Sequence, residues 1–142
     1  MFYQKILKNF RKKDFCPFCN SNSEFHIIEN ESAYITLARA PYVKNHLLVI
    51  PKRHVLSLNN LTGNEKKEIF DLMLFGIKLL EKKYPAVQMQ YKEGDLISAG
   101  KTIPHAHFHL VPKRKKTKEI KDKRKFLREG ELIKKVNEVK NF

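Results

Sequence analysis

The chain has 142 residues, enough for one domain that buries its own hydrophobic core. Hydrophobic residues make up 42% of the sequence, and no long apolar run stands near its beginning. We therefore expect no signal peptide, no contact with a membrane and a cytoplasmic location. The formal net charge of +14 would suggest a nucleic-acid-binding protein if it were spread over the whole chain.

The positive charge is instead concentrated at the two ends. Residues 14–110 carry 11 Lys and Arg against 10 Asp and Glu, whereas residues 1–13 and 111–142 together carry 18 against 5. The basic ends could bind a polyanion such as nucleic acid, or could be a Lys-rich solvated surface. The central part is nearly neutral, so a nucleic-acid partner stays open and is tied to the ends alone.

The first elements in chain order are short. Residues 1–13 alternate apolar and basic side chains and predict a short amphipathic arm. A Cys-x-x-Cys knuckle, Cys16 to Cys19, precedes a polar turn. Periodicity and flanking turn residues predict strands over 24–28, 32–40, 46–51, 87–92 and 102–111.

One long helix lies between these strands. Thr62 to Glu65 has the capping-box pattern, and Tyr84-Pro85 ends the helix after about Lys83. Its apolar residues recur at helical spacing and predict a core-facing stripe: Ile69, Leu72, Met73, Gly76, Leu79 and Leu80. Beyond Pro112 a charged, helix-like stretch carries apolar residues that would pack on the body or on a partner: Phe126, Ile133, Val136 and Val139. This order indicates an α+β fold with an antiparallel sheet.

Three histidines, His105, His107 and His109, alternate with apolar residues. On a strand they would share one face in a row, about 7 Å apart, while the alternate residues face a core: Ala106, Phe108 and Leu110. A single such histidine is commonly a satisfied core residue, but three neutral imidazoles bury poorly without partners. A purely metal-binding row and an accidental His-rich edge are the alternatives. The pattern favours phosphoryl or metal chemistry.

The two cysteines could form a disulfide, a redox pair or half of a metal site. A structural disulfide is not expected in a cytosolic chain, and a redox motif would come with a βαβ setting. Half of a zinc site needs two more nitrogen or sulfur ligands. Only histidines can supply them, because the chain has no other cysteine. A reduced thiol pair without metal is the alternative.

The His-x-His-x-His motif, with apolar x, resembles that of the histidine triad (HIT) family. Gly100-Lys-Thr-Ile-Pro leads into it as the family's Gly-Gln-Ser/Thr segment does, and Asn45-His-Leu-Leu-Val-Ile-Pro-Lys-Arg-His54 is similar to a second family motif. The resemblance covers roughly residues 14–114 and implies a five-stranded antiparallel sheet with a long helix. We therefore divide the chain into a basic arm (1–13), a HIT domain (14–114) and a basic C-terminal, helical extension (115–142).

The resemblance, which is to the zinc-containing Hint/Fhit-like hydrolase branch, implies a nucleotidyl hydrolase. Its substrate would be a nucleoside phosphoramidate, a dinucleoside polyphosphate or another adenylated molecule, cleaved at the α-phosphate. The family roles make His107 the nucleophile that forms a covalent nucleotidyl intermediate, oriented by the backbone carbonyl of His105. His109 and His46 would surround the phosphate oxygens, and Thr102 would lie near the leaving group.

Further roles follow from the same resemblance. Lys101 replaces the usual Gln and would add a positive charge beside the phosphate, and Gly100 and His105 complete the expected substrate-binding set. Zinc-bearing relatives supply one histidine after the Ile-Pro strand and the first histidine of the triad. A closed, structural zinc site would then consist of Cys16, Cys19, His54 and His105. His26 matches no family position and is expected on the surface of a strand.

One position departs from the family. An Asp or Asn eight residues before His46 accepts the ribose hydroxyls in relatives, and Ala38 stands there. Thr36 or Arg39 would replace it, or the ribose would bind weakly. Histidine rather than Gln at position 109 favours hydrolysis over nucleotide transfer.

Two other functions stay open. An aprataxin-like enzyme would remove AMP from nucleic-acid ends, although no zinc-finger pattern follows the triad. A nucleotide-binding protein with little turnover is the other. The resemblance also implies a homodimer paired through the long helix and a sheet edge, but the stripe from Ile69 to Leu80 could equally pack inside the molecule.

Overall fold

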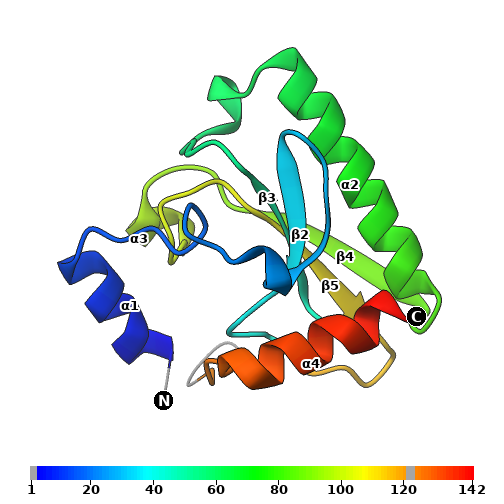
Figure 1. Ribbon diagram of the computed structural model, residues 1–142. Coiled ribbons are helices and arrows are strands. Elements are labelled where there is room, and N and C mark those ends of the chain that lie inside the picture. Colours follow the sequence, from blue (N-terminus) through cyan, green and yellow to red (C-terminus); the bar gives the residue numbers. More distant parts are fainter. Residues whose placement is uncertain (1–2, 121–123) are drawn as a thin grey trace.

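A five-stranded antiparallel sheet forms the centre of the computed structural model, which describes residues 3–120 and 124–142 (Figure 1). Its strands are β1 (His26–Glu29), β2 (Ala33–Leu37), β3 (Leu47–Pro51), β4 (Ala86–Tyr91) and β5 (Phe108–Lys113). They lie in the order β1-β2-β3-β5-β4, and each neighbouring pair is antiparallel. The predicted α+β fold with a five-stranded antiparallel sheet is confirmed.

In the described part of the chain, four α-helices lie around the sheet: α1 (Tyr3–Lys12), α2 (Gly63–Glu81), α3 (Leu96–Ala99) and α4 (Glu129–Lys140). Single 3₁₀ turns lie at Ser23–Phe25 and Leu58–Asn60. Helix α2 packs on β2, β3, β4 and β5, whereas α4 packs on β1 and β2. Helix α1 lies apart from α2, on the other side of the sheet in Figure 1. None of the helices in the described ranges combines the length and the hydropathy needed to cross a bilayer.

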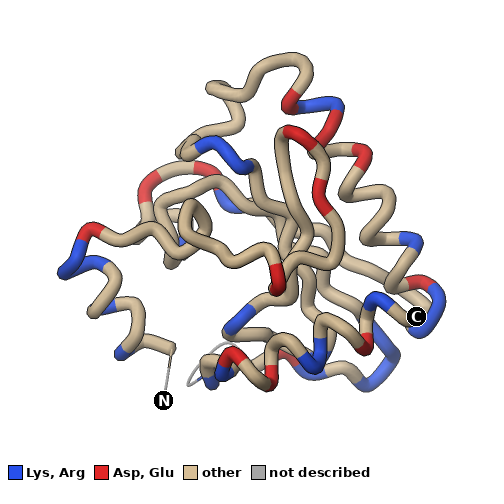
Figure 2. Tube along the Cα trace, viewed as in Figure 1, with Lys and Arg blue, Asp and Glu red and all other residues tan. Residues whose placement is uncertain are grey.

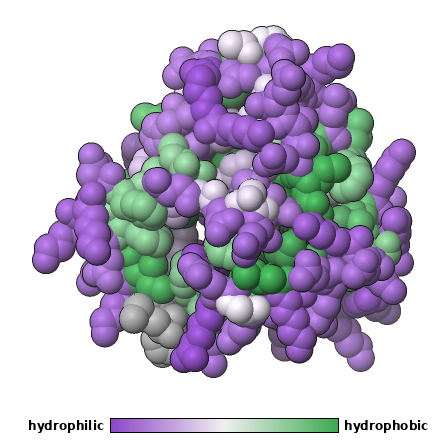
Figure 3. Space-filling view, viewed as in Figure 1, coloured by the Kyte–Doolittle hydropathy of each residue, from purple (hydrophilic) through white to green (hydrophobic). Residues whose placement is uncertain are grey.

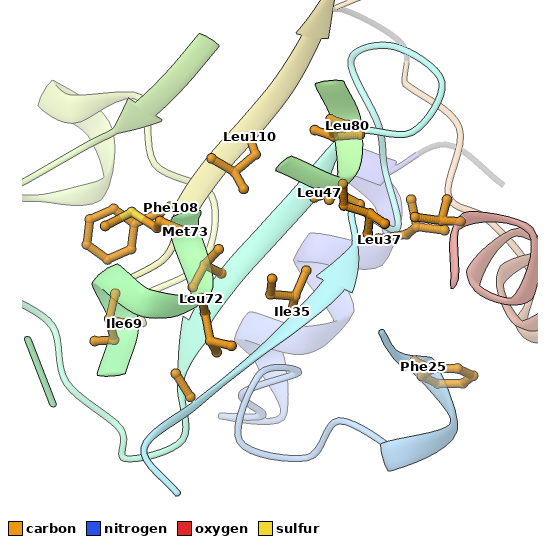
Figure 4. Close-up of a cluster of buried hydrophobic side chains, with 14 of the residues drawn as sticks. Phe25, Ile35, Leu37, Leu47, Ile69, Leu72, Met73, Leu80, Phe108 and Leu110 are labelled. Carbon is orange, nitrogen blue, oxygen red and sulfur yellow. The ribbon is translucent and has the colours of Figure 1, made fainter. Parts of the chain in front are cut away.

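The apolar stripe of α2 is buried against the sheet, as the helical spacing predicts (Figure 4). Gly76 lies at the closest approach, because a Cβ added there would be 2.5 Å from Cδ1 of Leu110. The stripe therefore belongs to the core of one chain and is not free to hold a partner. The face of α2 that points away carries exposed apolar side chains, namely Phe70, Leu74 and Phe75.

Both charged ends fold onto the body. Tyr3 and Leu7 of α1 are buried, and Leu132, Val136 and Val139 of α4 join the main core. Helix α4 carries both signs of charge (Figure 2): Glu129, Glu131 and Glu138 against Lys134, Lys135 and Lys140. The extension therefore packs on its own chain through its apolar residues and shows no block of a single charge along α4.

The strand predicted over 102–111 is wrong for its first half. Strand β5 begins only at Phe108, opposite Val49 of β3. Pro104 cannot donate a backbone hydrogen bond, and the N–H of Ala106 donates to the carbonyl of Val55 at 2.7 Å instead of joining the ladder. The three histidines therefore do not form one row on a strand, although the apolar residues between and after them are buried as predicted.

The start of α2 offers a test of local stability. Thr62 Oγ1 accepts the Glu65 N–H at 3.1 Å, Glu65 Oε1 accepts the Thr62 N–H at 2.9 Å, and Arg53 Nη2 donates to Oε1 at 2.7 Å. The Arg53 bond, followed by the cap, lowers the pKa of Glu65 from 4.5 to about 2. Replacing Glu65 by Gln should lower the free energy of unfolding by about 1 kcal/mol at pH 7.

The pH dependence of that effect has a definite sign. Because folding lowers the pKa of Glu65, its stabilisation is complete above pH 4.5 and is lost as the pH falls toward 2. Urea unfolding at pH 7 and pH 3 should show the difference between wild type and Glu65→Gln shrinking at the lower pH. A difference that stays constant would contradict this account of the carboxylate.

Candidate active site

A cavity of about 350 Å³ lies between the sheet, α1 and the segment that leads into α4. Figure 3 shows the surface hollowed beside α1. Histidines from three elements line it: His46 just before β3, His107 in the loop before β5, and His109 on β5. Its volume is at the lower end of the range for small-molecule sites.

The backbone fixes the tautomer of His107. Its Nδ1–H donates to the carbonyl of His105 at 2.7 Å, so Nε2 keeps a free lone pair when the ring is neutral. Phe18 packs edge-on against the same ring, with 5.0 Å between the ring centroids. The His109 ring contacts it too, with centroids 4.9 Å apart, so one backbone bond and two ring contacts hold the imidazole with the Nε2 lone pair free.

A chain of hydrogen bonds fixes the other two rings. The N–H of Tyr42 donates to His46 Nδ1 at 3.1 Å, so the proton of neutral His46 is on Nε2. That Nε2–H donates to His109 Nδ1 at 2.8 Å. The proton of neutral His109 is therefore on its own Nε2. His109 can therefore donate a hydrogen bond from Nε2, whereas neutral His107 has a lone pair on Nε2.

The three rings are neutral at physiological pH. Burial lowers the pKa of His46 to about 3, that of His107 to about 4 and that of His109 to about 2, because charging a buried imidazole costs solvation energy. Nearby cations lower the pKa of His107 and His109 further, Lys92 among them. A cavity with cations beside neutral imidazoles suits an anionic ligand.

The remaining expected substrate residues lie at the same cavity. Thr102 Oγ1 is 3.2 Å from the hydroxyl of Tyr3. Lys101 is buried, with Nζ 3.5 Å from the carbonyl of Leu56. Gly100 ends α3 with φ of 68°, a conformation that favours glycine, and its carbonyl accepts from Lys92 Nζ at 3.0 Å. The structure brings these residues to one wall, while their roles stay predictions.

Four nitrogen and sulfur groups meet behind His107. The ligand atoms of Cys16, Cys19, His54 and His105 all lie within 4.8 Å of one another. Cys19 Sγ is 3.1 Å from His54 Nδ1 and 3.5 Å from His105 Nδ1, and the two Nδ1 atoms are 3.1 Å apart. A tetrahedral zinc with usual bond lengths would separate its ligand atoms by roughly 3.3–3.8 Å. The measured distances of 3.1–3.5 Å lie near these values, and the limit of 4.8 Å for the whole set means that small side-chain shifts would complete a tetrahedron.

The protonation of His105 also fits a metal ligand. Its Nε2–H donates to the carbonyl of Pro51 at 2.7 Å, so in the neutral ring Nδ1 has a free lone pair. That lone pair points at the His54 nitrogen and two sulfur atoms. Such a carbonyl partner on the far nitrogen is the usual way in which proteins orient a metal-binding histidine. The donor set is therefore suited to zinc.

Ala38 lies at the cavity and has no side-chain acceptor, and its two proposed replacements differ in what they offer. Ala38 is buried beside His46, whose carbonyl accepts its N–H at 2.8 Å. Thr36 donates its hydroxyl to the carbonyl of Phe25, and Arg39 is a donor whose Nε bonds to the carbonyl of Leu127. Arg39 therefore cannot replace the missing carboxylate as an acceptor, whereas the hydroxyl oxygen of Thr36 keeps a lone pair and lines the cavity.

His26 lies outside the cavity at the start of β1. It stacks on Tyr34 at 3.9 Å between ring centroids, and its two nitrogens contact Glu29 and Ser21. Desolvation lowers its pKa, and the carboxylate of Glu29 partly opposes that shift. These contacts make His26 a partly buried strand residue rather than a ligand.

Sequence reasoning missed the aromatic and basic residues that surround the histidines. Tyr42 stacks on His109 with ring centroids 5.4 Å apart, and Phe18 contacts His107. Phe18 stands inside the cysteine knuckle, a position that pointed to the site. Tyr3 and Arg124 also line the cavity, from the two chain ends, and no pattern in the sequence linked them to it.

Together these features define a histidine site that can attack an electrophile such as phosphorus and donate to the developing anion, supported by a zinc-type cluster. A model of the HIT domain matches residues 20–116. The chain therefore belongs to the histidine triad (HIT) family.

Individual relatives agree with the family. The chain is 31% identical over 101 residues to the asymmetrical bis(5'-nucleosyl)-tetraphosphatase of Schizosaccharomyces pombe, a match that covers 71% of this chain and 54% of that protein. The match thus spans about half of that relative. A HIT-like protein involved in cell-cycle regulation from Bartonella henselae has the same fold, with a TM-score of 0.74 and 15% identity. That match covers 87% of this chain and 90% of the Bartonella protein. A Zn-bound histidine triad family protein from Mycobacterium smegmatis has a TM-score of 0.67 and 22% identity, and the match covers 89% of this chain and 91% of that protein.

Proposed function

We propose that the protein hydrolyses a nucleotidyl substrate at its α-phosphate through a covalent nucleotidyl-His107 intermediate. The observation that carries the proposal is the 2.7 Å bond from His107 Nδ1–H to the carbonyl of His105, which makes Nε2 a neutral nucleophile in the cavity. The relative from S. pombe is named as a bis(5'-nucleosyl)-tetraphosphatase, which supports a nucleotide hydrolase. The substrate classes we propose are dinucleoside polyphosphates, nucleoside phosphoramidates and adenylated molecules.

The reaction would take two displacements. His107 Nε2 attacks the α-phosphorus, and the bond from phosphorus to the leaving group breaks with its electron pair going to that group, which then takes up a proton. Water then attacks the same phosphorus and gives up a proton to solvent, and the phosphorus–nitrogen bond breaks with its electron pair returning to His107 Nε2, which frees neutral His107 and the nucleoside monophosphate. In both steps the Nε2–H of His109 would donate to a phosphate oxygen while His46 holds that ring in place.

The proposal is tested by incubating the protein with diadenosine tetraphosphate and with adenosine 5′-phosphoramidate and measuring released AMP by chromatography. Turnover that depends on His107 supports a hydrolase. AMP binding without any turnover favours the binding-protein alternative. The aprataxin-like alternative stays a prediction, and release of AMP from an adenylated DNA end in preference to both small substrates would favour it.

We propose further that zinc occupies the site of Cys16, Cys19, His54 and His105. Protein atoms would fill all four coordination positions, so bound zinc would stabilise the fold and would have no open position for substrate or water. The ion would fix His105, and the carbonyl of the same residue holds His107. The chain's own contribution to catalysis here is to hold the proton of His107 on Nδ1.

Ala38 leads to a prediction about the sugar. With alanine at position 38, we expect kcat/KM for a ribonucleotide substrate and for its 2′-deoxy counterpart to differ by less than about threefold, because no buried carboxylate at that position would be left unpaired. Introducing the carboxylate with Ala38→Asp should raise the preference for ribose to about tenfold. A wild-type preference above tenfold would show that another group recognises the hydroxyls.

We also propose a homodimer. Phe70 and Leu74 on the outer face of α2 and Met89 on the edge strand β4 are each about half exposed, and a long helix and a sheet edge are the two elements through which the family resemblance implies pairing. Light scattering should give twice the chain mass for wild type, and Leu74→Glu should give the mass of one chain. A wild-type monomer at micromolar concentration would contradict the proposal.

A further inference from the structure

The two ends of the chain meet at the cavity. The N–H of Tyr3 donates to the carbonyl of Arg124 at 3.0 Å. The N–H of Leu127 donates to the carbonyl of Arg39 at 2.7 Å, in the segment that leads to His46. We call α1 together with Arg124, Phe126 and Leu127 the terminal wall; Lys125 between them is exposed and does not line the cavity. The wall lies outside residues 20–116, the part that matches the HIT domain.

The terminal wall is a packed structure rather than a loose tail. Tyr3 and Leu7 are 7% and 2% exposed, and they form a small core of their own with Ala40 and Ile103. Phe126 packs on this core, and its ring lies parallel to that of Tyr3 with 6.1 Å between centroids. Ile103 belongs to the loop that carries the triad, so the wall is fixed directly to the site.

Arg124 is held between two aromatic rings. Its Cζ lies 4.9 Å from the ring centroid of Tyr3 and 4.7 Å from that of Tyr42, and Nη1 donates to the carbonyl of Ala40 at 2.9 Å. Tyr42 in turn stacks on His109. The guanidinium is therefore fixed one ring away from the triad, at a point where it lines the cavity.

Tyr3 places a hydroxyl beside the expected leaving-group residue. Its oxygen is 3.2 Å from Thr102 Oγ1, and both residues line the cavity. Burial raises the pKa of Tyr3, so the hydroxyl stays protonated at neutral pH and can donate. Arg39, Lys92 and Lys101 line the same cavity, so the wall adds a fourth cation and a neutral donor to one region.

We propose that the terminal wall forms part of the leaving-group subsite, in which Arg124 and Tyr3 bind an anionic polyphosphate leaving group. The inference rests on the proposed hydrolase function and deepens it, because it assigns leaving-group preference to residues outside the matched domain. Charge explains why these residues would favour a polyphosphate leaving group. A guanidinium donates charge-assisted hydrogen bonds to phosphate oxygens. The leaving group of a phosphoramidate is ammonia or ammonium, which carries no negative charge for the guanidinium to bind.

The test compares two substrates that share the adenylyl group and differ in the group that leaves. Arg124→Gln should lower kcat/KM for diadenosine tetraphosphate at least about tenfold more than that for adenosine 5′-phosphoramidate. Tyr3→Phe, which removes only a hydroxyl, should shift the same ratio by about threefold. The matched control is Lys125→Gln, which removes one exposed charge from the neighbouring residue and should leave the ratio unchanged.

Binding of inorganic tripolyphosphate, measured by calorimetry at fixed ionic strength, separates this inference from the proposed function. If tripolyphosphate binds more weakly to Arg124→Gln than to Lys125→Gln, the subsite is supported even if wild type releases no AMP. The absence of AMP release would refute only the hydrolase function. Equal tripolyphosphate affinity in the two variants would overturn the subsite. Equal loss on both substrates would likewise overturn it, because Arg124 would then serve structure alone. Thermal unfolding of each variant identifies misfolding. If Arg124→Gln does not fold, the substrate ratio measured for Tyr3→Phe decides between the subsite and a structural role.

Discussion

Replacing His107 by Asn is expected to lower kcat/KM for AMP release by at least about 10⁴-fold, because a nucleophile that forms the covalent intermediate has no substitute in the cavity. AMP affinity should change by less than about threefold, because His46, His109 and the cations remain. Asn removes the ring nitrogen and keeps a side chain that can donate to the carbonyl of His105. Calorimetry with AMP and a chromatographic assay of its release measure the two effects separately.

His26→Asn is the matched control for that variant. The same substitution is made, but His26 lies outside the cavity lining, on β1. Its activity should stay within about twofold of wild type. Two results would count against the assigned role of His107: turnover by His107→Asn within tenfold of wild type, or a loss of AMP binding that matches the loss of rate.

Loss of zinc is expected to have the second large effect. Cys16→Ser should lower the free energy of unfolding by about 3–5 kcal/mol, because closed zinc sites contribute binding energy directly to folding. For a chain of this size that corresponds to a decrease in Tm of at least about 10 °C. Partial desolvation and the Cys16 thiol raise the pKa of Cys19 to about 11, and a bound cation is what would favour the thiolate there.

Elemental analysis and calorimetric melting test this prediction together. Wild type should contain one zinc per chain and lose stability in a strong chelator, whereas Cys16→Ser should contain none and should not respond to the chelator. Ser21→Ala, a change just outside the knuckle, should keep the metal. Purified wild type with no zinc and a Tm unaffected by added zinc would show that the cysteines are a reduced thiol pair.

Local patterns predicted the elements that depend on local interactions. The capping box and the spacing of apolar residues gave α2, whose bounds are Gly63–Glu81, because these signals lie within one or two turns. The zinc-type cluster joins Cys16 to His105, 89 residues apart, and no spacing within the chain predicts that contact. It was predicted only through the resemblance to a family.

The beginning of β5 and the terminal wall show where such reasoning ends. The alternation from His105 to His109 indicated a strand, but pairing with β3 stops at Phe108 because the preceding loop bonds to Val55. The wall depends on contacts such as that between Tyr3 and Thr102, which are 99 residues apart and leave no periodic signal. Charge alone suggested a solvated or nucleic-acid-binding end, whereas Arg124 faces the cavity.

The covalent intermediate is the central claim, and intact-protein mass spectrometry tests it most directly. Wild-type protein is mixed with diadenosine tetraphosphate or adenosine 5′-phosphoramidate, the reaction is quenched after milliseconds to seconds, and the mass of the intact protein is measured. We predict a transient gain of one adenylyl group per chain that disappears as AMP accumulates and is absent from His107→Asn. AMP release with no adduct at any time, or an adduct of equal amount on His107→Asn, would contradict the account.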